Sequence, residues 1–211
     1  ARGQYAVAHA GFDTLATLDS DSALVPPLKA FLAELTLLED QTDHGRTAAI
    51  FQYRALISLS PKDMNASRAR WRVGDLYVEM KWFQEAVVSY EDASAHALSP
   101  SDADRSLLGL GVTLGSIGRW TEAERAFDTV RKRATDNRLL MRATLGQANA
   151  LYAQHRKRDA LPLYDVLYRG GPDFIKTDPN QLQQYGDVLF DAGQLERARD
   201  VDALLYNLYP S

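Results

Sequence analysis

Cysteine is absent from the 211-residue chain. Without thiols the protein forms no disulfide, carries no cysteine nucleophile and offers no thiolate ligand to a metal ion. Such a composition fits an oxidising compartment such as a periplasm, but a cytoplasmic protein can lack cysteine as well. The sequence therefore leaves the location of the protein open.

An excess of positive charge is also missing, since 24 lysines and arginines stand against 28 aspartates and glutamates and give a net charge of −4. Affinity for nucleic acid or for anionic lipid comes from clustered cations. No apolar run approaches the roughly 18 residues of a membrane-spanning helix. We therefore expect no nucleic-acid partner and no direct membrane insertion.

Motifs for catalysis are missing too: the sequence holds no glycine-rich phosphate loop, no HExxH metal motif and no nucleophile elbow. The closely spaced residues Glu39, Asp40, Asp43 and His44 could offer ligands to a divalent cation. A solvated acidic helix end explains them better, because no ordered loop accompanies them. The sequence predicts no enzyme, no metal site and no cofactor.

What the chain does contain is a pattern that repeats. Four alanines lie 37 residues apart (86 − 49, 123 − 86 and 160 − 123), and a fifth follows 38 residues after the fourth. They are Ala49, Ala86, Ala123, Ala160 and Ala198. Self-similarity at a period of roughly 20–50 residues is typical of proteins built from stacked repeats.

The neighbours of each alanine predict a pair of helices. The residue four positions later is aromatic in four repeats and Asp202 in the fifth, and the residue seven positions later is apolar, so these positions form one helix face. Twelve positions earlier stands a small residue that lets two helices approach closely. This small residue is Gly74, Gly111, Ala148 or Gly186. Each unit therefore reads as two antiparallel helices that need their neighbours to bury their apolar faces.

A tight or left-handed turn is expected between the two helices, five positions before each alanine. Gly118 and Gly193 occupy this position in two repeats, and glycine is the least strained residue there. His44, Lys81 and His155 occupy it in the other three.

This order of small residue, turn, alanine and aromatic residue resembles the tetratricopeptide repeat. The resemblance places one continuous array of five repeats over 30–211, and a half repeat with only a second helix at 1–20. The five repeats are 30–63, 67–100, 104–137, 141–174 and 179–211. The resemblance implies an all-α fold in which stacked helical hairpins form a right-handed α-α superhelix, or solenoid.

The pattern predicts helices and no strand. The expected helices are 4–18, 27–42, 46–59, 66–79, 83–97, 102–116, 119–134, 138–153, 157–169, 179–191 and 195–209. Leu37 and Asp40 depart from the family pattern in the first repeat. Pro162 lies two residues after Ala160 and indicates either a late-starting helix or a kink.

The resemblance also implies which residues face a ligand, namely those on the concave surface of the first helices. These residues are Arg68, Trp71, Asp75, Arg105, Val112, Arg142, Asn149, Tyr152, Gln183, Asp187 and Phe190. Three arginines recur among them at a spacing of 37 and would hold an acidic partner through bidentate bonds to carboxylates. Alternatively, each arginine pairs with a nearby acid such as Asp75, Asp102 or Asp104 on a solvated surface.

One amide and three aromatic residues beside the turns also have a predicted role. The amide of Asn149 can bond both the N–H and the C=O of an extended ligand backbone. Trp82, Phe83 and Trp120 lie beside the predicted turns and are expected in the core.

The leading hypothesis is a non-enzymatic scaffold or adaptor that binds a peptide or a partner helix in the groove. The alternative is an architectural spacer array in the periplasm, within a longer cell-envelope or exopolysaccharide-export protein. The broken first repeat indicates a fragment of a longer array, and repeat faces without polar caps would permit self-association through both ends.

Overall fold

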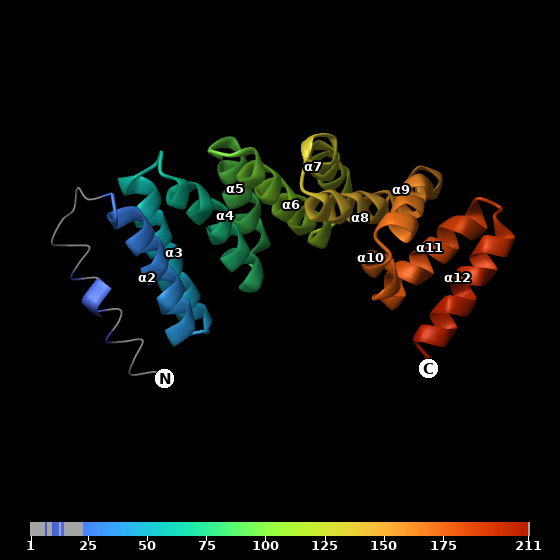
Figure 1. Cartoon of the computed structure of the whole chain (residues 1–211), viewed down its shortest axis with the longest axis horizontal. Coiled ribbons are helices and arrows are strands. Elements are labelled where there is room, and N and C mark those ends of the chain that lie inside the picture. Colours follow the sequence, from blue (N-terminus) through green and yellow to red (C-terminus); the bar gives the residue numbers. More distant parts are fainter. Residues whose placement is uncertain (1–6, 8–9, 13, 15–22, 211) are drawn as a thin grey trace. The chain divides into compact units, whose positions relative to one another are not determined.

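The computed structural model describes residues 7, 10–12, 14 and 23–210, and all regular structure in this part of the chain is helical (Figure 1). The chain divides into two compact units, Ala1–Gly109 and Leu110–Ser211, with the division inside α6 (Pro100–Ser116). None of the helices described there is long and apolar enough to cross a membrane. The predicted all-α architecture is confirmed.

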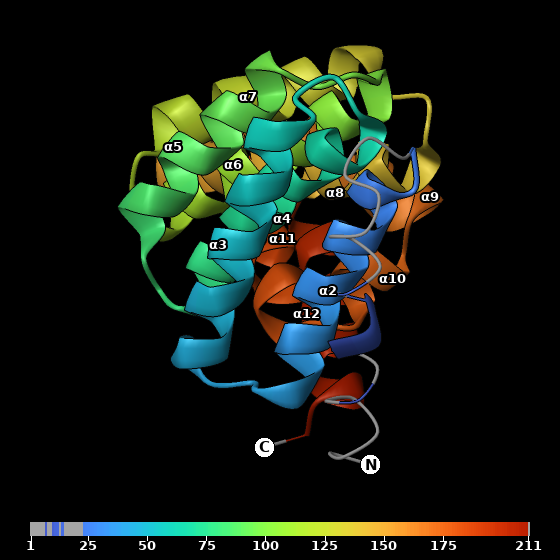
Figure 2. The same cartoon turned by 90° about the vertical axis from the view of Figure 1, so that its left-hand side faces the viewer.

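The first unit is built from helical hairpins. They use α2 (Val25–Glu39), α3 (Asp43–Leu59), α4 (Met64–Glu79), α5 (Phe83–Ala95) and the first part of α6. Helix α2 packs on α3, and Figure 2 shows the two side by side. Helix α4 packs on α5 and also contacts α3 and α2. Helix α4 is thus held by its own partner and by the preceding hairpin.

The second unit continues the same arrangement. After the last part of α6 come α7 (Trp120–Arg133), α8 (Asn137–Ala153), α9 (Lys157–Gly170), α10 (Asp173–Lys176), α11 (Pro179–Asp191) and α12 (Leu195–Leu208). Helix α8 packs on α7 and α9, and α11 packs on α9 and α12. The core of α8 to α12 contains Leu167, Ile175 and Leu182, which are fully buried, together with the rings of Tyr164 and Tyr185.

Most of the predicted helices appear with ends shifted by a few residues. The predicted helix 4–18 lies largely outside the described residues. The short helix α10 was not predicted, because its segment follows the Gly170-Gly171-Pro172 break; Ile175 nevertheless anchors it in the core. Helix α9 begins at Lys157 and runs through Pro162, so the late start is wrong.

The four turns after α4, α6, α8 and α11 share one geometry. Lys81, Gly118, His155 and Gly193 all have positive φ, between 59° and 78°. In the first turn the Trp82 N–H donates to the Tyr77 carbonyl at 2.8 Å and the Lys81 N–H to the Val78 carbonyl at 2.9 Å. The other three turns repeat both bonds, the pattern of a Schellman motif.

The turn expected at His44 is wrong. The Thr42 side chain accepts a hydrogen bond from the His44 N–H, so α3 begins at Asp43 and His44 lies within its first turn. A side-chain oxygen at this position satisfies an otherwise unpaired helix N–H, which explains why the helix starts before the predicted position.

Aromatic rings on the second helices pack against glycines on the first helices. A Cβ added to Gly74 would lie 2.7 Å from Cε1 of Tyr90, and one added to Gly109 would lie 2.5 Å from the same atom. Phe127 lies in the same way between Gly111 and Gly146. The ring of one hairpin therefore fills the space between two successive first helices, which explains the predicted recurrence of small residues.

Candidate ligand-binding sites

All eleven residues predicted to face a ligand lie on α4, α6, α8 or α11, and each is exposed or half-buried. They divide between the units. Arg68, Trp71, Asp75 and Arg105 belong to the first, and the others to the second. Each unit also contains a cavity lined by some of them, so the two sites are described separately.

The cavity of the first unit has a volume of about 330 Å³ and lies between α2, α3 and α4. Arg68, Trp71, Arg72, Glu34 and Tyr53 are among the residues that line it. Arg72 Nε lies 3.0 Å from Glu34 Oε1, and the Tyr53 hydroxyl donates to the same carboxylate. Burial alone would raise the pKa of Glu34, but the hydrogen bonds from Arg72 and Tyr53 outweigh it and lower that pKa. Glu34 therefore neutralises Arg72, and Arg68 leaves the cavity with net positive charge.

Beside this cavity the Arg105 guanidinium lies over the Trp71 ring, with Cζ 3.8 Å from the ring centroid. The contact has the geometry of a cation–π interaction. Trp71 thus fixes the position of the Arg105 guanidinium.

Of the acids that the alternative names, Asp75 interacts electrostatically with Arg105. Among the described carboxylates none forms an ion pair with Arg68, Arg105 or Arg142. Asp102 is buried and accepts a hydrogen bond from the Ser67 hydroxyl at 3.1 Å. Asp75 accepts one from Tyr90 at 2.5 Å and lies 4.0 Å from Arg72.

Asp75 is therefore half-buried and hydrogen-bonded to the buried Tyr90. Burial raises the pKa of Asp75, although the hydrogen bond from Tyr90 and the positive charges of Arg72 and Arg105 act in the opposite direction. Burial and the Asp75 charge together raise the pKa of the Tyr90 hydroxyl.

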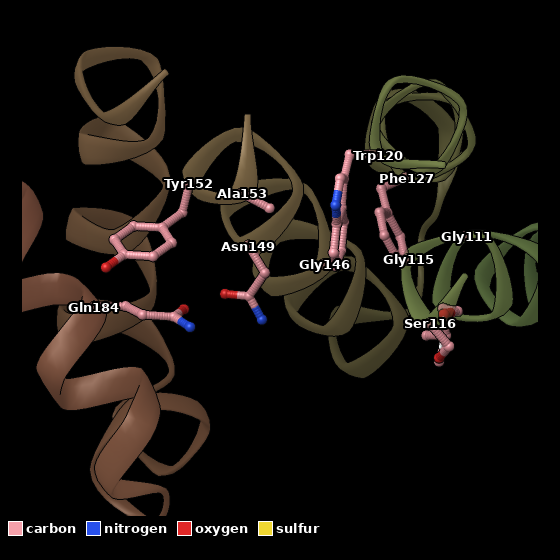
Figure 3. A pocket seen from close by; sticks show the side chains of 11 residues that line it. Gly111, Gly115, Ser116, Trp120, Phe127, Gly146, Asn149, Tyr152, Ala153 and Gln184 are labelled. Atoms are coloured by element: carbon pink, nitrogen blue, oxygen red, sulfur yellow. Dashed lines mark hydrogen bonds between the residues drawn. The ribbon is translucent and has the colours of Figure 1, made fainter. Parts of the chain in front are cut away.

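The cavity of the second unit is larger, with a volume of about 510 Å³, and every residue that lines it is uncharged. Figure 3 shows Asn149 in the middle of the lining side chains, with Trp120 and Phe127 on one side and Tyr152 and Gln184 on the other. Gly111, Gly115 and Gly146 form part of the wall and leave it without side-chain bulk. The site is an apolar space with a few polar groups.

Hydrogen bonds fix the polar groups at this cavity. The Tyr164 hydroxyl oxygen lies 2.8 Å from Asn149 Oδ1 and 2.9 Å from Gln184 Oε1. The Tyr152 hydroxyl donates to Asp187 Oδ2 at 2.7 Å, and this bond raises the pKa of Tyr152 to about 12. Asp187 is thus hydrogen-bonded to Tyr152.

No family model and no curated protein matches this sequence. Several solved structures match its fold. YrrB, described as a TPR protein with an unusual peptide-binding site, superposes with a TM-score of 0.69 at 14% identity, over 95% of this chain and 93% of that one. PilF of Pseudomonas aeruginosa superposes with a TM-score of 0.72 at 21% identity, over 100% of this chain and 86% of that one. A tetratricopeptide repeat protein of Parabacteroides merdae superposes with a TM-score of 0.65 at 17% identity, over 98% of this chain and 78% of that one.

The chain has the tetratricopeptide-repeat (TPR) fold. The resemblance seen in the sequence is confirmed at the level of the fold, together with the all-α superhelical class that it implies. Arrays of this fold generally act as protein-interaction scaffolds, because stacked repeats create extended binding surfaces.

Two tryptophans that were expected in the core lie elsewhere in the structure. Trp82 was expected in the core but is 48% exposed and stacks on Tyr77 with a centroid distance of 6.0 Å. Trp120 was expected there as well, yet it is half-buried and lines the second cavity. Both follow a Schellman turn at the end of a hairpin, where only one face of the ring meets the neighbouring helix.

A glutamine that the register does not select lines the second cavity. Gln183 is exposed on α11, whereas Gln184 lines the cavity and lies beside Tyr164. Nothing in the repeat pattern distinguishes the two. Arg142 and Phe190 are exposed, Phe190 at 65%, but neither lines one of the two cavities.

Proposed function

We propose that the chain is a non-enzymatic protein-interaction module that binds a peptide or a partner helix on the exposed faces of α4, α6, α8 and α11. Five TPR-like repeats over 30–211 would supply this surface. The TPR fold supports the proposal, and so does the peptide-binding site ascribed to YrrB. The eleven predicted residues are the proposed contacts, and two of them, Asp75 and Asp187, already accept hydrogen bonds from Tyr90 and Tyr152.

The observation that carries the proposal is the arrangement of Arg68, Trp71 and Arg105. Arg105 is held over Trp71 at 3.8 Å, and Arg68 lines the adjoining cavity with no acid to neutralise it among the described residues. Guanidinium groups bind carboxylates through paired, charge-assisted hydrogen bonds. An acidic segment of a partner protein therefore suits the first unit.

The test is reversal of the three recurring arginines, with Arg68, Arg105 and Arg142 each changed to Glu in one variant. Capture of an acidic partner from the source organism should be lost. A matched control changes Arg125, Arg158 and Arg199 to Glu, three exposed arginines outside the proposed surface, and should retain the partner. Equal capture by both variants would show that overall charge, or another face, is responsible. Failure to capture any partner would favour the architectural spacer.

Self-association is a further proposal, motivated by apolar side chains on α12. Tyr206 and Leu208 are exposed there although both are large and apolar. If this face pairs two copies, light scattering should give a mass that rises with concentration, and Tyr206→Glu should abolish the rise. A concentration-independent monomer mass for the unaltered chain would exclude it.

A further inference from the structure

The hydroxyl of Tyr164 lies between two amide oxygens, Oδ1 of Asn149 at 2.8 Å and Oε1 of Gln184 at 2.9 Å. A phenol has one proton and can donate to only one of them. The oxygen and nitrogen of an amide group are assigned from the hydrogen-bond network. The second amide must therefore be turned, so that its NH₂ group donates to the phenol oxygen.

This requirement determines what the two amides offer to a ligand. The amide that accepts from Tyr164 keeps its NH₂ group free, and the amide that donates to Tyr164 keeps its C=O free. Asn149 and Gln184 both line the cavity (Figure 3). The cavity thus presents one hydrogen-bond donor and one acceptor, held in place by a tyrosine that is otherwise fully buried.

A donor and an acceptor side by side match the C=O and N–H of a peptide backbone. In a helix these groups are already paired internally, whereas in an extended segment they are available. Two neutral amides offer no compensation to a charged ligand group, which would lose its hydration on entering. The polar groups of the cavity therefore favour an extended, uncharged segment.

The remaining space suits a large apolar side chain. The volume of about 510 Å³ falls within the range of roughly 300–1,000 Å³ that is usual for ligand pockets. Trp120 and Phe127 lie on one side, Tyr152 lies on the other, and Val112 is 48% exposed at this surface. Aromatic and aliphatic anchors that fill such pockets dominate the energy of peptide binding.

We propose that the second unit binds an extended peptide segment of a partner protein. A large uncharged side chain fills the cavity, and a backbone amide pairs with Asn149 and Gln184. This inference rests on the proposed function and specifies the ligand for one of its sites. It also separates the two units, because the acidic segment proposed for the first unit is unsuited to the second.

The first unit supplies a natural substitution for the test. Asp75 stands at the position of Asn149 two repeats earlier (149 − 75 = 74, twice 37), and it accepts a hydrogen bond from Tyr90, which occupies the place of Tyr164. Asn149→Asp therefore reproduces a pair that the fold already accommodates. It keeps the acceptor for Tyr164, removes the amide donor and adds a charge.

The experiment is a selection of random heptapeptides from a display library on the full chain, followed by measurement of their affinities for variants. Val112→Glu places a charge at the cavity, and Val166→Glu makes the same change on α9 at a residue that is 49% exposed. Circular dichroism and thermal unfolding verify that each variant folds.

Peptides with a large uncharged residue and no neighbouring charge should be enriched. Their affinity should fall about ten-fold or more in Val112→Glu and in Asn149→Asp, a change of about 1.4 kcal/mol, and should be unchanged in Val166→Glu. Enriched peptides that bind both cavity variants as well as the unaltered chain would overturn the proposal and leave peptide binding elsewhere intact. A selection that enriches nothing would overturn this proposal and the peptide-binding function together.

Discussion

Tyr90 in the first unit and Tyr164 in the second occupy the same place in the repeat, but their hydroxyl groups meet different partners. Tyr90 donates to the Asp75 carboxylate at 2.5 Å, whereas Tyr164 lies between the amides of Asn149 and Gln184. Both rings are buried. The comparison shows that the ring builds the fold, while the group bonded to its hydroxyl sets the chemistry of the surface.

The residues around the two tyrosines also differ in charge between the units. Around Asp75 lie Arg72 and Arg105, and the adjoining cavity carries a net positive charge from Arg68. Around Asn149 every cavity residue is uncharged. One repeat pattern therefore places charged groups around this position in the first unit and an uncharged cavity around it in the second.

Removing the rings should give the largest effect and should be similar in both units. Tyr90 and Phe127 are buried to the same degree, each between two glycines. Tyr90→Ala and Phe127→Ala should each lower the free energy of unfolding by about 3–5 kcal/mol, because a large cavity remains. Urea denaturation measures this loss. A loss below about 1 kcal/mol in either variant would show that the ring contributes little to the packing of the helices.

Removing only the hydroxyl should separate the units. Tyr90→Phe takes the donor from the buried Asp75 carboxylate, and hydrogen bonds to charged groups contribute about 1.5–3 kcal/mol. Tyr164→Phe takes it from neutral amides, for which about 0.5–1.5 kcal/mol is expected. The same denaturation experiment compares the two. Equal losses would indicate that Asp75 is protonated or solvated in the folded chain.

The smallest difference should appear in the pH dependence of stability. The pKa of Asp75 is raised from its ordinary value of 3.8 in the folded chain. The contribution of Asp75 to the stability of the folded chain is therefore fully present below pH 3.8. It is lost as the pH rises through the pKa that Asp75 has in the folded chain. The stability of the unaltered chain should fall relative to Asp75→Asn over this range. A constant difference between the two, measured by thermal unfolding from pH 3 upwards, would contradict a raised pKa.

Features that depend on repeat spacing could be predicted from the sequence. The spacing of 37 located the helix pairs, the close approach of helices at Gly74, and the turns at Lys81 and His155. At His44 the same spacing failed, because the Thr42 cap overrides it locally. Helix α10 lies between Ala160 and Ala198, where the spacing is 38, and one additional residue does not indicate a further helix.

The candidate sites could be predicted only in part. The repeat register placed Asn149 and Val112 at the second cavity, but the role of Gln184 depends on how its side chain meets Tyr164. Trp120 was assigned to the core because aromatic residues at helical spacing usually lie there. Its position at a hairpin end gives it a face on the cavity instead, and only the packing of α6 and α7 reveals this.

The most direct test of the difference between the units is a nuclear magnetic resonance titration of the full chain. Its reporters are the side-chain NH₂ signals of Asn149 and Gln184 and the indole N–H signals of Trp71 and Trp120. A neutral peptide from the selection should shift the signals of Asn149, Gln184 and Trp120, and an acidic peptide should shift that of Trp71. A neutral peptide that shifts Trp71 but leaves Asn149 and Trp120 unchanged would contradict the account.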